Sequence, residues 1–385
     1  MSDKSYKVLV NMSTLMQGGG LQVAAAFVVH AIRDPVAASW QFLLSAGAER
    51  EIAGFGIDTK GPRFHVFEKS PARDANERKR VLQIEKDFKP DLVFTLFGPA
   101  YVRFTSRHLC GVADPWVTHS NWVAFKTLGF SLATLQKLGL MLWKAGWWKA
   151  VDYWWTEAPI AKDGLVKRLR CDPDRIFVIP NTTGPQFSGQ TFRPNPPQSG
   201  RLEILCLSAY YGHKNLELIP HVALEMAKLR PKLDFRFTVT LPEDWPEVQA
   251  ILARAKELGV QDRVRNLGKV AVTETPALYE RSHLCFLPSL LEVFSAVYPE
   301  SLCTGVPLVT TNLRFASDVC KDAAAYFEPT NARSAAEQLI RLAEDPDLWR
   351  EMSARGQEIY RQLPDAAEKW ALQKGMIQDI AARPS

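Results

Sequence analysis

The sequence has no cysteine framework. Its six cysteines are scattered along 385 residues, and no two of them form a C-x-x-C pair. Most of them lie among apolar neighbours, which is typical of buried free thiols rather than of disulfide-bonded cysteines. This pattern fits a reducing compartment, and we expect a cytoplasmic protein.

Long apolar runs are missing as well. No stretch reaches the roughly 18 consecutive apolar residues of a spanning helix. The N-terminus, MSDKSYKVLVNMS, passes from polar residues straight into an apolar strand, without the h-region and cleavage site of a signal peptide. We therefore expect neither a secretion signal nor a transmembrane helix.

A strong charge excess is also absent. The 47 Lys and Arg residues against 42 Asp and Glu residues give a net charge of +5, which is mild for this length and argues against a nucleic-acid partner. It permits an anionic ligand or a membrane surface. Hydrophobic residues make up 46% of the chain, and no repeat or low-complexity tract is visible, so large apolar cores are expected.

The chain is too long for a single hydrophobic core, which predicts two domains. Short β-rich or aromatic runs alternate with segments long enough for helices, and this alternation predicts mostly parallel sheets in an α/β fold. The runs expected to form strands are KVLVNMS, FHVFEKS, DLVFTLF, PWVTHS, DYWWTEA and RIFVIPN in the first half, and LEILCLSA, FRFTVTL, RVRNLGKV, HLCFLPS, PLVTT and AAAYFEP in the second.

A stretch rich in Pro, Gly, Ser and Gln separates the two halves. Its sequence, TTGPQFSGQTFRPNPPQSG, has no apolar periodicity and is interpreted as an interdomain linker. We predict a first domain over residues 1–184, a linker over 185–200, a second domain over 201–364, and an amphipathic C-terminal helix within 365–385. Two doubly wound halves would place a ligand cleft between them, at the carboxyl ends of the strands.

Two carboxylates interrupt the otherwise apolar stretch LPSLLEVFSAVYPESLCTG. Because proline is tolerated in a helix only near its first turn, Pro299 predicts a helix that begins between about Ser295 and Pro299. Gly305 should end that helix. Glu292 then lies in the loop before the helix, and Glu300 lies in its first turns.

Such an arrangement suits a ligand with several hydroxyl groups and a phosphate. The two carboxylates can accept hydrogen bonds from sugar hydroxyls, while the backbone N–H groups of Phe294, Ser295 and Ala296 would favour a phosphate at the helix N-terminus. A diphosphate flanked by two sugars would meet all these groups. The alternative is that Glu300 merely complements the helix dipole and that Glu292 is solvated.

The same stretch resembles the retaining GT-B glycosyltransferases of family four, also called group 1. Their second domain carries a strand, P-S, E-x7-E and G-x-P-x-V-[TA], and here this pattern reads PSLLEVFSAVYPESLCTGVPLVT. The resemblance covers residues 6 to 375. It implies two Rossmann-like doubly wound domains facing across a cleft: an acceptor-binding domain first, a nucleotide-sugar-binding domain second, and a C-terminal helix that crosses back to the first. By resemblance, Glu292 holds the transferred sugar and Glu300 the ribose of the nucleotide.

Further motifs match the family in order along the chain. In LSAYYGHKNLELIPHVA, Lys214 is placed to meet the donor diphosphate as a point charge, and Tyr210, near the position of the family's arginine, would offer a hydroxyl. In MQGGGLQVAAAF, glycines including Gly19 and Gly20 would let the backbone approach a ligand closely, although a simple turn is the alternative.

PWVTHSNW is expected to end a strand with His119, where the family has a histidine against the donor sugar. The resemblance implies positioning and charge stabilisation for His119; a purely structural hydrogen bond is the alternative. Asn181 in VIPNTTG would help set the hinge between the domains. The D-x-D at residues 172–174 lies in a loop before a strand and is interpreted as a turn and not as a metal site. The resemblance also implies no metal, since Lys214 and the helix N-terminus would take the place of a cation.

Residues 131–155 are the candidate for membrane association. Lys137 and Lys144 lie one heptad apart on one helix face, Leu, Met and Trp fill much of the rest, and Trp143, Trp147 and Trp148 suit an interface. Two interpretations stay open. The segment either docks on the cytoplasmic leaflet or covers the acceptor cleft as part of the core.

Taken with its motifs, the resemblance implies a retaining, metal-independent hexosyltransferase without a cofactor. It would move a hexose-type sugar from a GDP- or UDP-sugar to a saccharide acceptor, preferably lipid-linked, in bacterial surface polysaccharide synthesis such as that of lipopolysaccharide. It would be cytoplasmic, or peripheral on the inner face of the membrane. Alternatives are a GT-B nucleotide-sugar 2-epimerase and a non-catalytic nucleotide-sugar-binding module. A Rossmann oxidoreductase is disfavoured because the glycine pattern is not G-x-G-x-x-G.

Overall fold

The computed structural model describes residues 6–16, 18–34, 38–129, 132–198 and 200–383. The chain separates into two compact units. Unit 1 contains Met1–His119, Leu132–Pro180 and Ala367–Ser385, and unit 2 contains Ser120–Ser131 and Asn181–Ala366. Each unit is therefore built from segments that are distant in the sequence.

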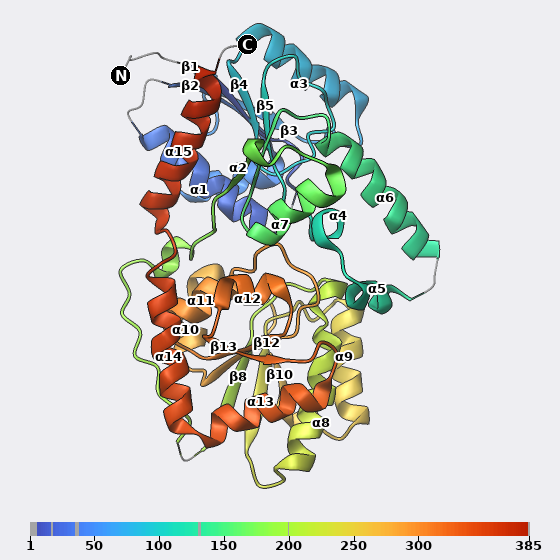
Figure 1. The fold of residues 1–385 in the computed structure, drawn as a ribbon, viewed down its shortest axis with the longest axis vertical. Helices are drawn as coiled ribbons and strands as arrows, with labels where there is room; N and C mark the ends of the chain where they lie inside the picture. The colour runs from blue at the N-terminus through green and yellow to red at the C-terminus, as the bar shows by residue number, and fades with distance from the viewer. Residues whose placement is uncertain (1–5, 17, 35–37, 130–131, 199, 384–385) are drawn as a thin grey trace. The chain divides into compact units, whose positions relative to one another are not determined.

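Unit 1 is built on a parallel sheet of seven described strands in the order β3-β2-β1-β4-β5-β6-β7, flanked by helices (Figure 1). Its strands are β1 (Tyr6–Met12), β2 (Ala38–Ser45), β3 (Phe64–Phe67), β4 (Leu92–Thr95), β5 (His108–Gly111), β6 (Tyr153–Thr156) and β7 (Ile176–Val178). Its helices are α1 (Gly19–Arg33), α2 (Ala46–Gly54), α3 (Ala75–Phe88), α4 (Pro115–His119), α6 (Leu132–Trp148), α7 (Pro159–Gly164) and α15 (Ala366–Ala382).

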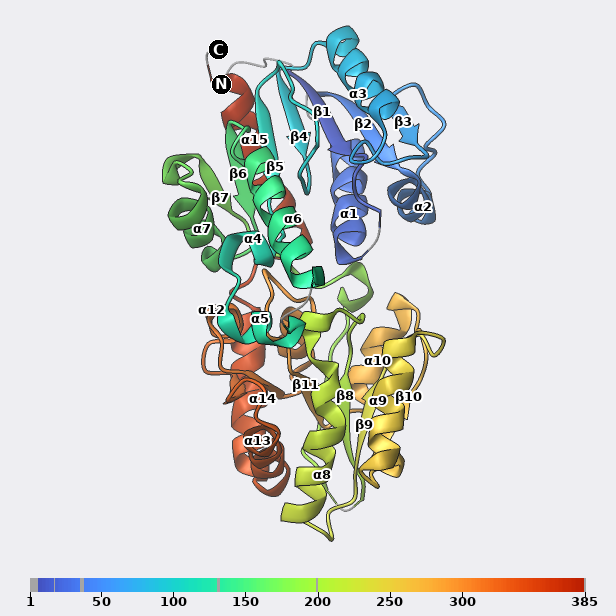
Figure 2. The ribbon, with the colours of Figure 1, turned by 90° about the vertical axis from the view of Figure 1, so that its right-hand side faces the viewer.

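Unit 2 has a parallel sheet of six described strands in the order β10-β9-β8-β11-β12-β13, also flanked by helices (Figure 2). Its strands are β8 (Leu202–Cys206), β9 (Phe235–Val239), β10 (Val264–Asn266), β11 (Leu284–Leu287), β12 (Leu308–Thr311) and β13 (Ala324–Phe327). Its helices are α5 (Trp122–Leu128), α8 (Ile219–Leu229), α9 (Pro246–Glu257), α10 (Thr275–Glu280), α11 (Val297–Thr304), α12 (Arg314–Cys320), α13 (Ala332–Glu344) and α14 (Pro346–Tyr360). Both strand orders reverse direction next to the first strand, which is the doubly wound pattern.

All six strands predicted for the second half are confirmed. In the first half, two strands were not predicted and one predicted strand is wrong. Strands β2 and β5 were not predicted; β2 begins with partly exposed residues, and β5 has only four residues. The predicted strand PWVTHS is wrong, because these residues form helix α4. Asp114 caps this helix by accepting from the backbone N–H of Trp116 at 3.1 Å, and Pro115 suits a first helical position.

The predicted linker also needs correction, because residues 181–366 belong to unit 2. Phe187 and Phe192 within it are buried, with ring centroids 6.0 Å apart. The Phe187 ring also meets Tyr279 of α10 edge-on, at 5.9 Å. These two aromatic side chains bury enough apolar surface to hold a Pro-rich stretch against unit 2.

Residues 120–131 were predicted to lie in the first domain, but they belong to unit 2. The side chain of Asn121 caps α5 by accepting from Ala124 N at 2.8 Å, and it donates to the backbone oxygen of Leu290 at 2.7 Å. This bond attaches α5 to the loop after β11, although its sequence neighbours α4 and α6 lie in unit 1.

The C-terminal helix α15 packs into unit 1 alongside α1 (Figure 1). Trp370 is buried there, with its ring 5.4 Å from that of Phe27 and stacked on His30. Its indole N–H donates to Asp34 at 2.6 Å, and Lys374 pairs with the same carboxylate at 2.9 Å. One apolar ring and one shared carboxylate thus fasten this helix to α1.

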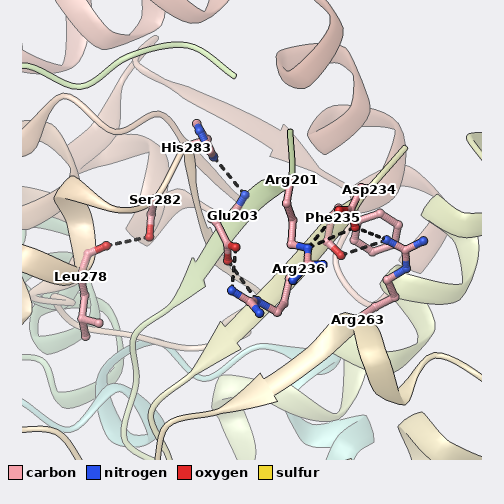
Figure 3. Close-up of polar contacts among 9 residues, drawn as sticks. All are labelled: Arg201, Glu203, Asp234, Phe235, Arg236, Arg263, Leu278, Ser282 and His283. Atoms are coloured by element: carbon pink, nitrogen blue, oxygen red, sulfur yellow. Dashed lines mark hydrogen bonds and ion pairs between the residues drawn. The ribbon is translucent and has the colours of Figure 1, made fainter. Parts of the chain in front are cut away.

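A polar network joins the amino ends of the strands in unit 2 (Figure 3). Arg236 holds Glu203 through two hydrogen bonds of 2.7 and 3.2 Å, while Arg201 and Arg263 share Asp234. His283 accepts from the backbone N–H of Glu203 at 3.0 Å, and burial lowers the pKa of this histidine, which keeps the ring neutral. The charged contacts lie at the end of the sheet opposite to the loops of the predicted site.

The six cysteines are all free, and all but the half-buried Cys303 are buried, as the sequence predicted. Within the described part of the chain, no helix combines the length and the hydropathy needed to span a bilayer.

Removing the Trp370 ring should loosen α15 from unit 1. We expect Trp370→Ala to lower the free energy of unfolding by about 3–5 kcal/mol, since a large buried side chain is replaced by a cavity. Leu372→Ala is the matched control, because Leu372 lies on the same helix, is 50% exposed, and should change stability by less than about 0.5 kcal/mol. Urea unfolding followed by circular dichroism measures both; equal losses would show that α15 does not depend on this ring.

Candidate active site

The carboxyl ends of β8 and β11 are adjacent at the centre of the unit 2 sheet. From β8 the chain continues to α8, which packs with α9 and α13, and from β11 it continues to α11, which packs with α10, α12 and α14. The two loops therefore diverge toward opposite faces of the sheet. Such a divergence at the carboxyl ends of parallel strands opens a crevice suited to a ligand.

Lys214 and Glu292 occupy these two loops and form a largely buried ion pair. Lys214 ends a short 3-10 turn, Gly212–Lys214, after β8, and its ammonium group contacts Oε1 of Glu292. The two side chains are only 12% and 9% exposed. Because neither charge is well hydrated, each depends on the other or on a ligand that replaces it.

Backbone contacts hold the loop that carries Glu292. The N–H of Leu290 donates to the carbonyl of His213 at 2.8 Å, next to Lys214 in the other loop. The hydroxyl of Thr311 donates to the carbonyl of Ser289 at 2.7 Å. Together with the Asn121 bond to Leu290, these contacts tie the loop to β12, to α5 and to the loop after β8, so the Glu292 carboxylate is presented from a rigid segment.

Helix α11 begins at Val297 and is ended by Gly305 at its C-cap, as the sequence predicted. Gly305 has a φ of 71°, and a Cβ there would come within 2.9 Å of the side chains of Ser353 and Gln357, so the position needs glycine twice over. The first N–H groups of the helix, at Ala296 and Val297, have no acceptor within it. They form the positive end of the helix dipole beside the loop of Glu292.

Glu300 lies in the first turn of α11 and is buried, where Oε2 accepts the hydroxyl of Tyr279 at 3.0 Å. Burial raises the pKa of Glu300 to about 7, while the hydrogen bond from Tyr279 acts in the opposite direction. At neutral pH the carboxyl is thus poised between its two protonation states, and a hydroxylated ligand could bind to either of them.

The remaining predicted contacts of unit 2 differ in their exposure. Ser295 is buried, Phe294 is half-buried and Ala296 is exposed at the start of α11. Tyr210 donates its hydroxyl to Glu217, and its ring packs against the apolar core of the unit. These contacts give Tyr210 a structural role. The contact of Tyr210 with a diphosphate stays a prediction.

The predicted site residues of unit 1 lie at the ends of its first and fourth helices. Gly18, with a φ of 88°, precedes α1, which begins at Gly19 and Gly20. A Cβ on Gly19 would meet nothing within 4 Å, and one on Gly20 would make an ordinary contact with Phe97, so only Gly18 requires glycine by its conformation. His119 ends α4, and its Nδ1 lies 2.8 Å from the hydroxyl of Thr118.

Residues 172–174 form the predicted turn. Asp172 caps a short 3-10 turn by accepting from the N–H of Asp174 at 3.0 Å, which confirms the structural interpretation of this D-x-D. Among the described residues, no three His, Cys, Asp or Glu side chains gather closely enough to hold a metal ion. Asn181 is the first residue of its unit 2 segment, and its predicted hinge role stays a prediction.

Two residues of the site were missed in the sequence. Tyr279 sits in PALYE on α10, and nothing in that run distinguishes a partner of Glu300 from an ordinary core tyrosine. Asn121 carries a recognisable helix-cap signal, since it precedes the helical run WVAFKTL, but its bond to Leu290 bridges 169 residues of sequence. Both contacts depend on tertiary packing.

A family model described as glycosyl transferases group 1 matches residues 189–359. This segment contains β8 to β13, the Lys214–Glu292 pair and Glu300. Residues 189–359 form a group 1 glycosyl transferase domain. The match lies within unit 2 and includes the E-x7-E motif.

Two curated relatives match this chain over shorter segments. The N-acetyl-alpha-D-glucosaminyl L-malate synthase of Bacillus anthracis is 30% identical over 152 residues, or 39% of each chain. The O-antigen chain mannosyltransferase B of Escherichia coli is 31% identical over 94 residues, or 24% of each chain. The chain thus spans two fifths or less of the length of these curated relatives.

The fold of the group 1 domain together with unit 1 is shared with solved structures. An Anabaena protein, HepE, solved in complex with UDP-glucose, superimposes with a TM-score of 0.68 over 98% of this chain and 100% of its own, at 14% identity. Two Rossmann-like domains with parallel sheets in one chain are the GT-B fold, as the sequence resemblance implied.

Glu300 predicts a pH dependence of stability. Because its pKa is about 7 in the folded chain and 4.5 ordinarily, the protonated carboxyl is favoured by folding. The resulting stability is complete below pH 4.5 and is lost as the pH rises through 7. Glu300→Gln should therefore stabilise the protein at pH 8 relative to wild type by up to about 3 kcal/mol, and the difference should shrink toward pH 5.

Thermal unfolding of both proteins between pH 5 and pH 8 measures this difference. Glu351→Gln, an exposed position on α14, serves as the control and should leave the pH profile unchanged. A constant offset between Glu300→Gln and wild type across the whole range would mean that Glu300 does not titrate in this window.

Proposed function

We propose that this protein is a retaining glycosyltransferase that moves a hexose-type sugar from a nucleotide diphosphate donor to a saccharide acceptor. The observation on which the proposal rests is the buried Lys214–Glu292 pair at the junction of β8 and β11, within a group 1 domain. A cation and a carboxylate held together with little access to water suit a ligand that is anionic at one end and hydroxylated at the other.

In this proposal the donor binds between Lys214 and Glu292 and separates them. Its diphosphate accepts from Lys214 and from the N–H groups at the start of α11, while hydroxyls of the transferred sugar donate to the Glu292 carboxylate. The ribose hydroxyls bond to Glu300. Each charge that the ion pair gives up is satisfied by the donor, so binding does not leave a buried charge unpaired.

The same groups would stabilise the leaving nucleotide. As the glycosidic bond breaks, negative charge grows on the diphosphate, next to the Lys214 ammonium group and the positive end of α11. These fixed charges would act where a metal ion acts in other sugar transferases, so we propose a metal-independent reaction. His119 of unit 1 would position the donor sugar and stabilise charge, with its ring orientation set by the contact of Nδ1 with Thr118.

The names of the relatives support the biological setting of this proposal. One is an O-antigen chain mannosyltransferase and another an N-acetyl-alpha-D-glucosaminyl L-malate synthase, and a protein of the same fold was solved with UDP-glucose. We propose a GDP- or UDP-hexose as the donor, no further cofactor, and a lipid-linked saccharide of a bacterial surface polysaccharide such as lipopolysaccharide as the acceptor.

Substitutions at the ion pair and at Glu300 should separate chemistry from binding. We expect Glu292→Ala and Lys214→Ala each to lower the transfer rate by about a hundredfold or more, because each removes a charge needed in the transition state. Glu300→Ala should instead weaken nucleotide binding by roughly tenfold. Nucleotide release from a panel of GDP-, UDP- and dTDP-sugars, combined with nucleotide titration, measures both quantities.

Glu292→Gln controls for the unpaired Lys214 that Glu292→Ala leaves behind, and Glu351→Gln controls for loss of an exposed carboxylate. The reverse ranking of Glu292 and Glu300 would contradict the assigned roles. Binding of a donor without nucleotide release from any member of the panel would replace the transferase proposal with that of a binding module.

We further propose that α6 docks this enzyme on the cytoplasmic face of a membrane. Four leucines lie on one face of this helix. Three of them are mostly exposed, Leu132 at 72%, Leu135 at 67% and Leu142 at 76%, and Leu138 is 39% exposed. Trp143, 47% exposed, stacks on Tyr101 at 4.8 Å and suits the headgroup region. The interface prediction is wrong for Trp148, which is fully buried in an apolar cluster of unit 1.

The polar face of α6 is the one that packs on the protein. Lys144 pairs with Asp114 at 2.7 Å, and the Lys137 ammonium group lies 3.5 Å from the centre of the Trp116 ring. Both lysines share one face, as the heptad spacing predicted, but that face is turned inward. Since the helix contains no acidic residue and the exposed Lys149 follows it, the outward apolar face suits an anionic bilayer.

Leu135→Ser combined with Leu142→Ser should abolish most of the membrane affinity. We expect flotation with vesicles of phosphatidylethanolamine and phosphatidylglycerol to fall by at least about tenfold, since two exposed leucines no longer insert. Leu372→Ser, a change of an exposed leucine on α15, should leave flotation unaffected. Equal flotation of the double variant and wild type, or none by wild type, would contradict the proposal.

A further inference from the structure

A pocket of about 420 Å³ lies between α5 and the segment that follows β13. It is lined by Val123, Lys126 and Thr127 of α5 and by Pro329 and Thr330 after β13. All five residues belong to unit 2. The function proposed above uses none of them.

The pocket is on the same edge of the sheet as the Lys214–Glu292 pair. Pro329 and Thr330 follow the carboxyl end of β13, which is separated from β11 by β12 alone. Neighbouring strands lie about 4.8 Å apart, so the ends of β11 and β13 are roughly 10 Å apart. A disaccharide could span such a distance.

Helix α5 is fixed to the loop of Glu292 rather than loosely placed. The Asn121 side chain bonds to the carbonyl of Leu290, two residues before Glu292, and α5 also contacts the 3-10 turn that ends at Lys214. A ligand held by α5 is therefore held at a set position relative to both members of the ion pair.

The side chains of the pocket indicate the chemistry of its ligand. Lys126 is exposed and forms no ion pair with any residue in the described part of the chain, and no carboxylate lines the pocket. Thr127 donates its hydroxyl to Ala124 at 2.7 Å, which leaves its oxygen as an acceptor for a ligand hydroxyl. One free cation with a hydroxyl acceptor suits a group that is both anionic and hydroxylated.

Trp122 adds a flat apolar surface beside this cation. The ring is 66% exposed, which is unusual for so large an aromatic side chain, and the Lys126 ammonium group lies 6.0 Å from its centre. An exposed indole can cover the apolar face of a pyranose ring while a neighbouring lysine meets a charged substituent of that ring.

We propose that Trp122, Lys126 and this pocket bind a phosphorylated saccharide and so form part of the acceptor site. The assignment to the acceptor rests on the proposed transferase function, whereas the binding itself does not. Trp122 covers the sugar ring, Lys126 pairs with the phosphate, and the oxygen of Thr127 accepts a sugar hydroxyl. The acceptor would thereby be recognised by the same unit that holds the donor.

Isothermal titration calorimetry on the full chain tests the binding, with glucose 6-phosphate, glucose and inorganic phosphate as probes. We expect glucose 6-phosphate to bind at least about fivefold more tightly than either of the others, since it alone meets both the ring and the cation. Lys126→Gln should remove this preference over glucose, and Trp122→Ala should weaken both sugars by about fivefold. Trp122→Phe should retain most of the affinity.

Lys214→Ala is the control for probe bound in the donor crevice and should leave these affinities unchanged, and Lys149→Gln controls for loss of an exposed lysine. The inference is overturned if glucose 6-phosphate does not bind, if phosphate alone binds equally well, or if the Trp122 and Lys126 variants behave as wild type. Nucleotide release by wild type from the donor panel is read separately, so failure of the transferase proposal would be distinguished from failure of the pocket.

Discussion

The Lys214–Glu292 ion pair is the contact on which the site of unit 2 depends. Each partner stands at the carboxyl end of a different strand, and the two strands are neighbours only because the doubly wound order reverses between them. The pair is largely buried, so it persists only with both members or with a ligand in place. Backbone bonds from Leu290 and Ser289 hold the loop that brings Glu292 to Lys214.

Environment separates the two carboxylates of the E-x7-E motif. Glu292 faces a cation across the crevice, whereas Glu300 is enclosed within unit 2 and meets only the hydroxyl of Tyr279 among the contacts described above. Burial without a cation raises the pKa of Glu300 to about 7. Two glutamates on one motif thus acquire different properties from their surroundings, as is common where paired acids take different roles. Helix α6 of unit 1 shows a related effect: Lys144 pairs with Asp114, Lys137 lies over the Trp116 ring, and the leucines are left facing outward.

Much of the fold could be predicted from local patterns. The strands of unit 2 are short apolar runs bounded by turn residues, and each was found where the pattern placed it. In unit 1, PWVTHS has the composition of a strand, but Pro115 suits a first helical position and Asp114 accepts from the N–H of Trp116, and so the segment forms α4. The stretch around Phe187 has the composition of a linker, yet two phenylalanines bury themselves against unit 2. In both cases the contacts of one or two side chains determined the structure of the segment, against what its average composition indicates.

The sequence alone determined the alternation of strands and helices and the start and end of α11. It also placed Glu292, Glu300 and Lys214 at the ends of their elements. These features are local, because proline, glycine and apolar periodicity act over a few residues. Tertiary structure decided which of these groups meet. The pairing of Lys214 with Glu292 bridges 78 residues, that of Asn121 with Leu290 bridges 169, and that of Tyr279 with Glu300 bridges 21. Such contacts follow from strand order and helix packing, since burial and its effect on charge exist only once distant segments have excluded water together.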